Sequence, residues 1–80
     1  MGRVKPFLEL RQALERAGYD QKSLAPRIGR SQTYTSERFR GLRAWDLDDV
    51  YRILALLHLP VESIPELFPK DGGVHARKTA

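Results

Sequence analysis

The chain has 80 residues, no cysteine, and 14 basic against 10 acidic side chains, which gives a net charge of +4. This length predicts one small domain, and the lack of cysteine excludes disulfides and thiolate metal sites. No apolar run approaches the roughly 20 residues of a membrane-spanning helix, so we expect a cytoplasmic protein without membrane contact.

Charge is divided unevenly along the chain. Residues 20–43 hold six basic and two acidic side chains, a balance of +4, whereas residues 44–68 hold one basic and five acidic side chains, a balance of −4. One face of the domain should therefore be basic and attract phosphate. The alternative is that these charges are ordinary solvated side chains.

We expect the folded domain to occupy residues 6–69, after a loose N-terminal arm at residues 1–5. Pro6 suits the first turn of a helix, and Gly18 ends that helix. The residues that recur at helical spacing and should face the core are Phe7, Leu10, Leu14 and Ala17.

The stretch from Gln21 to Gly41 predicts two short helices joined by a tight turn. Asp20 can cap the first of them, and Gly29 can end it in a left-handed conformation. Pro26 is unusual inside a helix because proline lacks an N–H and crowds the carbonyl four residues before it. Either the helix begins near Ser23, which we favour, or it is kinked at Pro26.

The helix after the turn presents a polar face. Ser31 can cap this helix, Gly41 closes it, and Thr35 and Phe39 point inward at i and i+4. A surface of amide, hydroxyl and guanidinium groups is what reading base edges in a DNA major groove requires. The residues expected to point outward are Gln32, Thr33, Ser36, Glu37 and Arg40.

From about Phe7 to Phe68 the chain resembles the Cro and phage-repressor type helix-turn-helix family, in particular its small members from phages and mobile elements. The resemblance rests on Gln21 two residues before Ser23-Leu24-Ala25, on Ile28-Gly29, on Gly41 twelve residues later, and on LLHLPVESI at 56–64. It implies an all-α fold, a compact five-helix bundle with a central, lambda-repressor-like helix-turn-helix.

The resemblance also implies a function: a sequence-specific transcriptional regulator of repressor type that binds double-stranded DNA at the bacterial nucleoid. The third helix, residues 31–40, would enter the major groove. The expected base contacts are Gln32, Thr33, Ser36 and Glu37. The expected DNA-backbone contacts are Gln21, Lys22, Tyr34, Arg40 and Arg43. For Tyr34 the alternative is packing against the second helix.

The chain departs from the family's pattern beneath the third helix. Arg30, Thr35 and Arg38 stand at positions that are usually apolar, which should thin the core there. Phe39 stands where many relatives carry a glutamate paired with an arginine of the first helix. We predict that a Leu14–Phe39 contact replaces that ion pair.

The fourth helix should be the central core helix. Trp45 is expected in the core, Asp46 can cap the helix, and Asp48 and Asp49 fall in its first turn, where the helix dipole favours negative charge. Its wide apolar arc consists of Leu47, Val50, Tyr51, Ile53, Leu54 and Leu57. His58 ends this helix.

Pro60 should begin a last short helix, and residues 70–80 should form a disordered basic tail. This last segment has more apolar side chains than a small core needs, which predicts a pairing surface and a weak homodimer on DNA. The residues of this dimer interface are Leu59, Val61, Ile64, Leu67 and Phe68.

We find no catalytic constellation in the sequence, and expect no enzyme activity, metal, cofactor or small-molecule substrate. Two other functions stay open. One is a protein-interaction adaptor, since a helix-turn-helix fold does not fix a function. The other is a DNA-binding antitoxin of a toxin pair.

Overall fold

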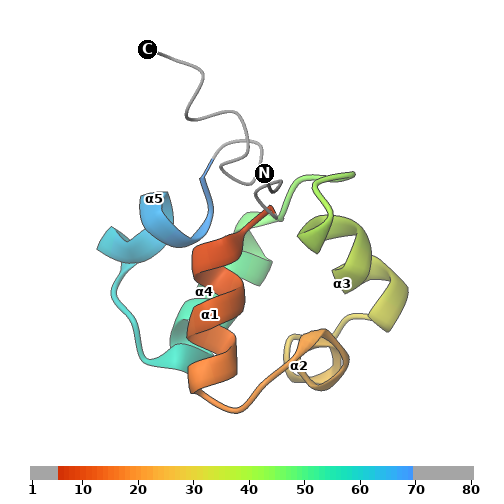
Figure 1. Cartoon of the computed structure of the whole chain (residues 1–80), viewed down its shortest axis with the longest axis horizontal. Helices are drawn as coiled ribbons and strands as arrows, with labels where there is room; N and C mark the ends of the chain where they lie inside the picture. Colours follow the sequence, from red (N-terminus) through yellow and green to blue (C-terminus); the bar gives the residue numbers. More distant parts are fainter. Residues whose placement is uncertain (1–5, 70–80) are drawn as a thin grey trace, which may run out of the picture.

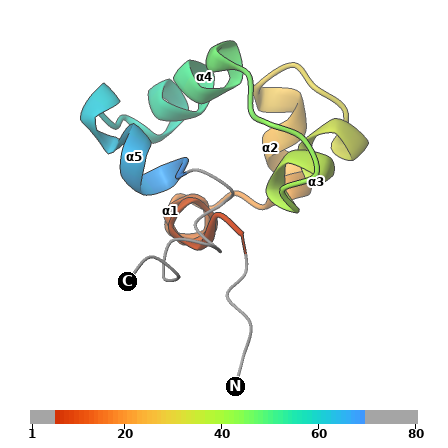
Figure 2. The ribbon, with the colours of Figure 1, turned by 90° about the horizontal axis from the view of Figure 1, so that it is seen from above.

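The computed structural model describes residues 6–69, and over these residues the chain is all-α. Its elements are α1 (Leu8–Arg16), α2 (Gln21–Arg27), α3 (Gln32–Phe39), α4 (Leu47–Leu57), a 3-10 turn η1 (Val61–Ser63) and α5 (Ile64–Leu67). Figures 1 and 2 show α1 in front of α4, with α2 and α3 on one side and α5 on the other. The five-helix fold expected from the sequence is confirmed. The arm at 1–5 and the tail at 70–80 lie outside the described residues.

Left-handed residues end the first four helices. Gly18, Gly29 and Gly41 have φ values of +88°, +72° and +79°. His58 ends α4 in the same conformation, with φ 57°. In each case the N–H of the following residue returns to a carbonyl in the last turn, at 2.8–3.0 Å: Tyr19 to Leu14, Arg30 to Ala25, Leu42 to Glu37 and Leu59 to Leu54. These are Schellman endings, which satisfy carbonyls that would otherwise lack partners.

The second helix begins at Gln21, so the expected start near Ser23 is wrong. The Asp20 carboxylate accepts a bond from the Ser23 N–H at 2.8 Å, and Ser23 Oγ accepts one from the Asp20 N–H at 2.9 Å. This capping box makes Ser23 the third residue of α2 and leaves Pro26 inside the helix. Pro26 therefore forfeits only the bond to the Lys22 carbonyl, and both residues are exposed.

The first helix begins at Leu8 rather than at Pro6. Phe7 precedes it with φ 57°, outside helical geometry, and yet its side chain is buried. The Pro6 carbonyl instead accepts a bond from Arg11 Nε at 2.7 Å. Ala17, expected in the core, is exposed because it stands at the C-terminal end of α1.

One hydrophobic core joins all five helices. The fully covered side chains include Leu10, Leu14, Leu24, Ile28, Phe39 and Ile53. Trp45 packs against this core, and its ring meets those of Phe7, Phe39 and Phe68 edge-on at centroid distances of 6.2, 5.2 and 5.8 Å. The expected core role of Trp45 is thus confirmed, and the expected partners Leu14 and Phe39 belong to the same cluster.

Helix α4 buries a narrower face than its sequence predicts. Val50, Ile53 and Leu54 are buried as expected, but Leu47 is 63% exposed and Tyr51 is 48% exposed. These two lie one turn apart along one edge of the face that meets the core, since Tyr51 is about 100° from the buried Val50 around the helix. Part of the predicted apolar arc is therefore a solvent-facing surface.

Candidate nucleic-acid interface

Helices α2 and α3 pack against each other and are linked by residues 28–31 (Figure 1). Ser31 Oγ accepts a bond from the Tyr34 N–H at 3.0 Å and caps α3, as expected. Thr35 is buried beneath the helix and donates from Oγ1 to the Ser31 carbonyl at 3.0 Å. A short polar helix is thus held at its start by its own side chains.

The expected base-reading residues share the outer part of α3. Gln32 and Thr33, in its first turn, are exposed, and Ser36 and Glu37, one turn later, are half-buried. Arg40 at the end of the helix is exposed. Thr35 and Phe39 point inward, as the sequence predicts. The structure therefore brings the four predicted base contacts onto one accessible part of one helix.

A polar cluster formed by Arg30, Tyr34, Asp46 and Asp49 lies between the start of α3 and the start of α4. Asp49 is fully buried. Its carboxylate accepts bonds from Arg30 Nε at 2.8 Å and from the Tyr34 hydroxyl at 2.6 Å. Asp46 lies at the exposed edge, 3.4 Å from Arg30 Nη2 and 3.2 Å from the Tyr34 hydroxyl.

Asp46 occupies the N-cap position of α4, but its carboxylate makes no capping bond, contrary to expectation. The carboxylate contacts Arg30 and Tyr34 instead. Asp46 thus interacts with side chains from another part of the chain and not with the backbone N–H groups of its own helix.

The two arginines at unusual positions stack on the same tyrosine. The guanidinium carbons of Arg30 and Arg38 lie 4.6 and 3.4 Å from the centroid of the Tyr34 ring. A guanidinium over an aromatic face is an attractive arrangement. The core beneath α3 is therefore not simply thinned, because cation–aromatic and charge-assisted contacts take the place of aliphatic packing.

The ionisation of the cluster follows from these contacts. Burial alone would raise the pKa of Asp49, but the hydrogen bonds from Tyr34 and Arg30 outweigh burial and lower it. Burial raises the pKa of Tyr34, and its bond to Asp49 raises it further. The bond to Asp49 also raises the pKa of Arg30. At neutral pH, then, Asp49 is a carboxylate, Tyr34 is neutral and Arg30 is charged.

Tyr34 was expected to contact a DNA phosphate or to pack against the second helix. Its single hydroxyl proton is directed to the Asp49 carboxylate of α4. A phosphate needs a donor, so Tyr34 cannot serve one without giving up this bond. In the structure Tyr34 links α3 to α4 instead of packing against the second helix, and a DNA contact from its hydroxyl would compete with this link.

The other residues expected to contact the DNA backbone differ in whether they form ion pairs within the protein. Lys22 and Arg40 are exposed. Arg43 Nε lies 3.4 Å from a carboxylate oxygen of Glu37, which also lies 3.5 Å from Arg38 Nη1. Glu37 and Arg43 thus form a surface ion pair beyond the middle of α3.

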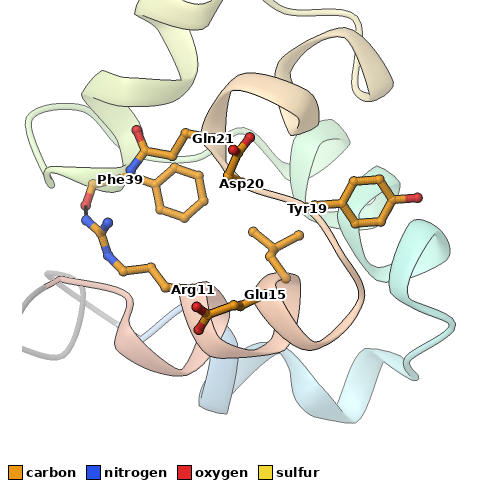
Figure 3. Close-up of a pocket in the computed structure, with 7 residues that line it drawn as sticks. Arg11, Glu15, Tyr19, Asp20, Gln21 and Phe39 are labelled. Carbon is orange, nitrogen blue, oxygen red and sulfur yellow. Dashed lines mark hydrogen bonds between the residues drawn. The ribbon is translucent and has the colours of Figure 1, made fainter.

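A hollow of about 230 Å³ separates α1 from α2 and α3, and Gln21 lines it. Figure 3 shows Arg11 and Glu15 on one side of it, facing Gln21 and Phe39 on the other. Arg11 Nη2 donates to the Phe39 carbonyl at 2.9 Å, and its guanidinium carbon lies 5.2 Å from the Phe39 ring centroid. Burial lowers the pKa of Arg11. Gln21 is half-buried at the rim, beside the end of α3.

The expected dimer interface is largely part of the protein's own core. Leu67 is buried, and three of the other residues pack against the core. Only Val61 of the five is a well-exposed side chain, at 53%. The residues that turn inward are Leu59, Ile64, Leu67 and Phe68. The premise that this segment has apolar side chains to spare is therefore wrong.

Three residues that hold the helix-turn-helix were not recognised from the sequence as partners: Asp49, Arg30 and Arg52. Arg52 of α4 donates from Nη1 to the Ile28 carbonyl at 2.8 Å, beside Gly29 in the turn. The available signal was the group of polar residues at core positions. Buried polar groups require hydrogen-bonding partners, and the acidic start of the fourth helix could supply them.

Within residues 6–69 no helix is long and apolar enough to cross a membrane. The same residues contain no group of three or more His, Cys, Asp or Glu side chains arranged to hold a metal ion. Comparison of the chain with family models, with curated proteins and with solved structures found no match.

Proposed function

We propose that this domain binds duplex DNA as a sequence-specific transcriptional regulator, with α3 in the major groove. The observation that carries the proposal is the exposed polar side of a short helix that is packed on α2 through a tight turn. Gln32 and Thr33 project from its first turn, and the first turns of such a helix are the part that contacts base edges. A glutamine side chain can pair with adenine through two hydrogen bonds.

Exposed positive charge on the same two helices supports the proposal. Lys22 at the start of α2 and Arg40 at the end of α3 are exposed cations. We assign both to phosphate contacts, which position a protein on the duplex without reading sequence. Gln21 would join them at the start of α2, and Arg43 would contribute while paired with Glu37.

Pairing of two copies on DNA stays part of the proposal, because one recognition helix covers only a few base pairs. Two copies would place their α3 helices in successive major grooves about 34 Å apart. Val61 is the residue of the expected interface that is exposed enough to contribute.

A protein-interaction module is the second candidate, and one observation favours it. Leu42, Leu47 and Tyr51 are large apolar side chains with exposed fractions of 63%, 63% and 48%. Leu47 and Tyr51 lie one turn apart on α4. A protein partner, such as the toxin of a toxin pair, could bind this side of α4 while α3 binds DNA.

Selection of bound fragments from random duplex DNA tests the proposal directly. We expect enrichment of one sequence, arranged as an inverted repeat with half-sites about 10 base pairs apart, and affinity that falls steeply with salt. Failure to enrich any sequence, together with affinity that does not change with salt, would exclude the DNA-binding function. A co-purifying protein that is lost on Tyr51→Ser would then support the interaction module.

A further inference from the structure

The buried carboxylate of Asp49 is the least expected feature of the molecule. It is fully covered, and it lies where the start of α3 meets the start of α4. We propose that Asp49, through Arg30 and Tyr34, fixes the rotation of α3 and thereby determines which bases the helix can read. This inference rests on the proposed DNA-binding function and adds positioning residues that do not touch DNA.

The bonds to Asp49 are directional. A buried carboxylate needs donors, and here it has one from the turn, Arg30 Nε at 2.8 Å, and one from α3, the Tyr34 hydroxyl at 2.6 Å. Charge-assisted hydrogen bonds of this length tolerate little change in angle or distance. Apolar packing, in contrast, has no preferred direction. The start of α3 is therefore held in a defined rotation about its axis.

The rotation of α3 that Tyr34 fixes also fixes the direction in which the proposed base-reading residues point. Successive residues of an α-helix are about 100° apart, so Ser36 points about 200° away from Tyr34. Gln32 precedes Ser36 by four residues and shares its side of the helix. With Tyr34 held against α4, Gln32 and Ser36 must point away from α4. A change in the rotation of α3 would move both reading residues together.

The remaining contacts hold other parts of the same unit. Arg52 of α4 fixes the turn through the Ile28 carbonyl. Arg11 of α1 fixes the end of α3 through the Phe39 carbonyl. Both bonds are made to backbone and do not involve a side chain of α3. Within residues 6–69, Tyr34 is the α3 residue whose side chain hydrogen-bonds to another helix, through its hydroxyl to Asp49, and for this reason we assign the orienting role to it.

The test compares conservative variants that differ in one polar group. Tyr34→Phe removes the hydroxyl and keeps the ring, and Asp49→Asn removes the charge and keeps the shape. Asp48→Asn is the matched control, because Asp48 is an exposed carboxylate one residue earlier in the same helix. The probes are the duplex selected by the parent protein, the same duplex with one base pair changed in the half-site, and an unrelated duplex.

We expect Tyr34→Phe to remain folded and to bind the unrelated duplex as the parent does. Its preference for the selected duplex over the changed one should fall by about tenfold, the worth of one good base contact. Asp49→Asn should lose at least as much, and Asp48→Asn should retain the parent's preference. If Tyr34→Phe keeps the full preference, the cluster has no orienting role and the inference is overturned, whatever the variant's stability.

Hydrogen exchange of the DNA-free protein supplies a second measurement and covers the case in which Asp49→Asn does not fold. Tyr34→Phe should speed exchange of the amides of α3 relative to those of α1. Equal exchange in the variant and the parent would contradict the inference. If the parent binds no duplex DNA, the proposed function fails, and the exchange result alone decides whether the cluster fixes α3.

Discussion

Phe39→Ala should strongly destabilise the domain. Phe39 is 1% exposed, its ring meets Trp45 edge-on at 5.2 Å, and Arg11 lies over it at the same distance. Removal of a buried phenylalanine ring costs about 3–5 kcal/mol. Because the ring borders a hollow into which Arg11 can move, we expect the lower half of this range. At about 0.05–0.15 kcal/mol per residue, a domain of 80 residues has roughly 4–12 kcal/mol of stability in total, so one side chain supports a large share of it.

Thermal and urea unfolding followed by far-UV circular dichroism measures this effect. At about 4–8 °C per kcal/mol for a small domain, the melting temperature should fall by roughly 15–30 °C. Phe39→Leu is the control, since it keeps most of the apolar volume and should cost about 1.5 kcal/mol or less. An alanine variant that melts within a few degrees of the parent would refute the assignment of Phe39 to the core, and with it the predicted contact with Leu14.

Three further predictions follow from the site. Gln32→Ala should cost about 1–3 kcal/mol on the selected DNA and relax selectivity at one base pair; equal losses on every sequence would assign Gln32 to a phosphate contact instead. Arg40→Ala should weaken binding to all sequences and reduce the magnitude of the salt slope by about 1, and an unchanged slope would show that it faces away from DNA. Since the pKa of Asp49 is lower in the folded state than its unfolded value of about 3.9, its contribution is fully present above that pH and is lost as pH falls through the folded pKa. Below pH 4, the free energy of unfolding measured with urea should therefore fall more steeply with decreasing pH in the parent than in Asp49→Asn. Parallel curves would show that Asp49 does not have a lowered pKa in the folded state.

The parts of the fold that sequence predicts well are those set by neighbouring residues. Asp20, Ser31, Gly18, Gly29 and Gly41 each act on the backbone within a few positions, through a cap or a left-handed turn. Such contacts require no knowledge of the rest of the molecule. For this reason the two helices that flank the turn were predictable, although the start of α2 was not. The outward direction of the residues proposed to contact bases was predictable too.

The polar cluster could not be predicted in the same way, because local and tertiary contacts compete for the same groups. Asp46 has the residue type and position of a cap, but its carboxylate contacts Arg30 and Tyr34 instead. Asp49 has the position of a dipole-stabilised surface carboxylate and is fully buried. The helix dipole contributes up to about 1 kcal/mol at an exposed site, which two hydrogen bonds to a charged group exceed. Which groups Asp46 and Asp49 bond to is therefore decided by the placement of α3 against α4, which neighbouring residues do not reveal.

The apolar surface was misassigned for a different reason. The count of apolar side chains in the C-terminal segment suggested a surplus, but Leu67 points into the core, and Ile64 and Phe68 pack against it. The surplus lies instead on α4, at Leu47 and Tyr51. A small core can bury only what faces it, and a count of residues does not give direction.

The two ends of α3 are held by different kinds of contact, and the difference matches what each end would do on DNA. The far end is held by the covered ring of Phe39, a contact that is strong but has no preferred direction, and by the bond from Arg11 to the Phe39 carbonyl, which fixes backbone rather than a side chain of α3. The near end is held by the bond between Tyr34 and Asp49, which fixes rotation. Reading a base requires hydrogen bonds aligned within tenths of an ångström, whereas a phosphate contact from a long cation such as Arg40 tolerates more movement. If α3 reads bases as proposed, a directional contact to one of its side chains is therefore needed at its start, whereas apolar packing and a backbone bond are sufficient at its other end.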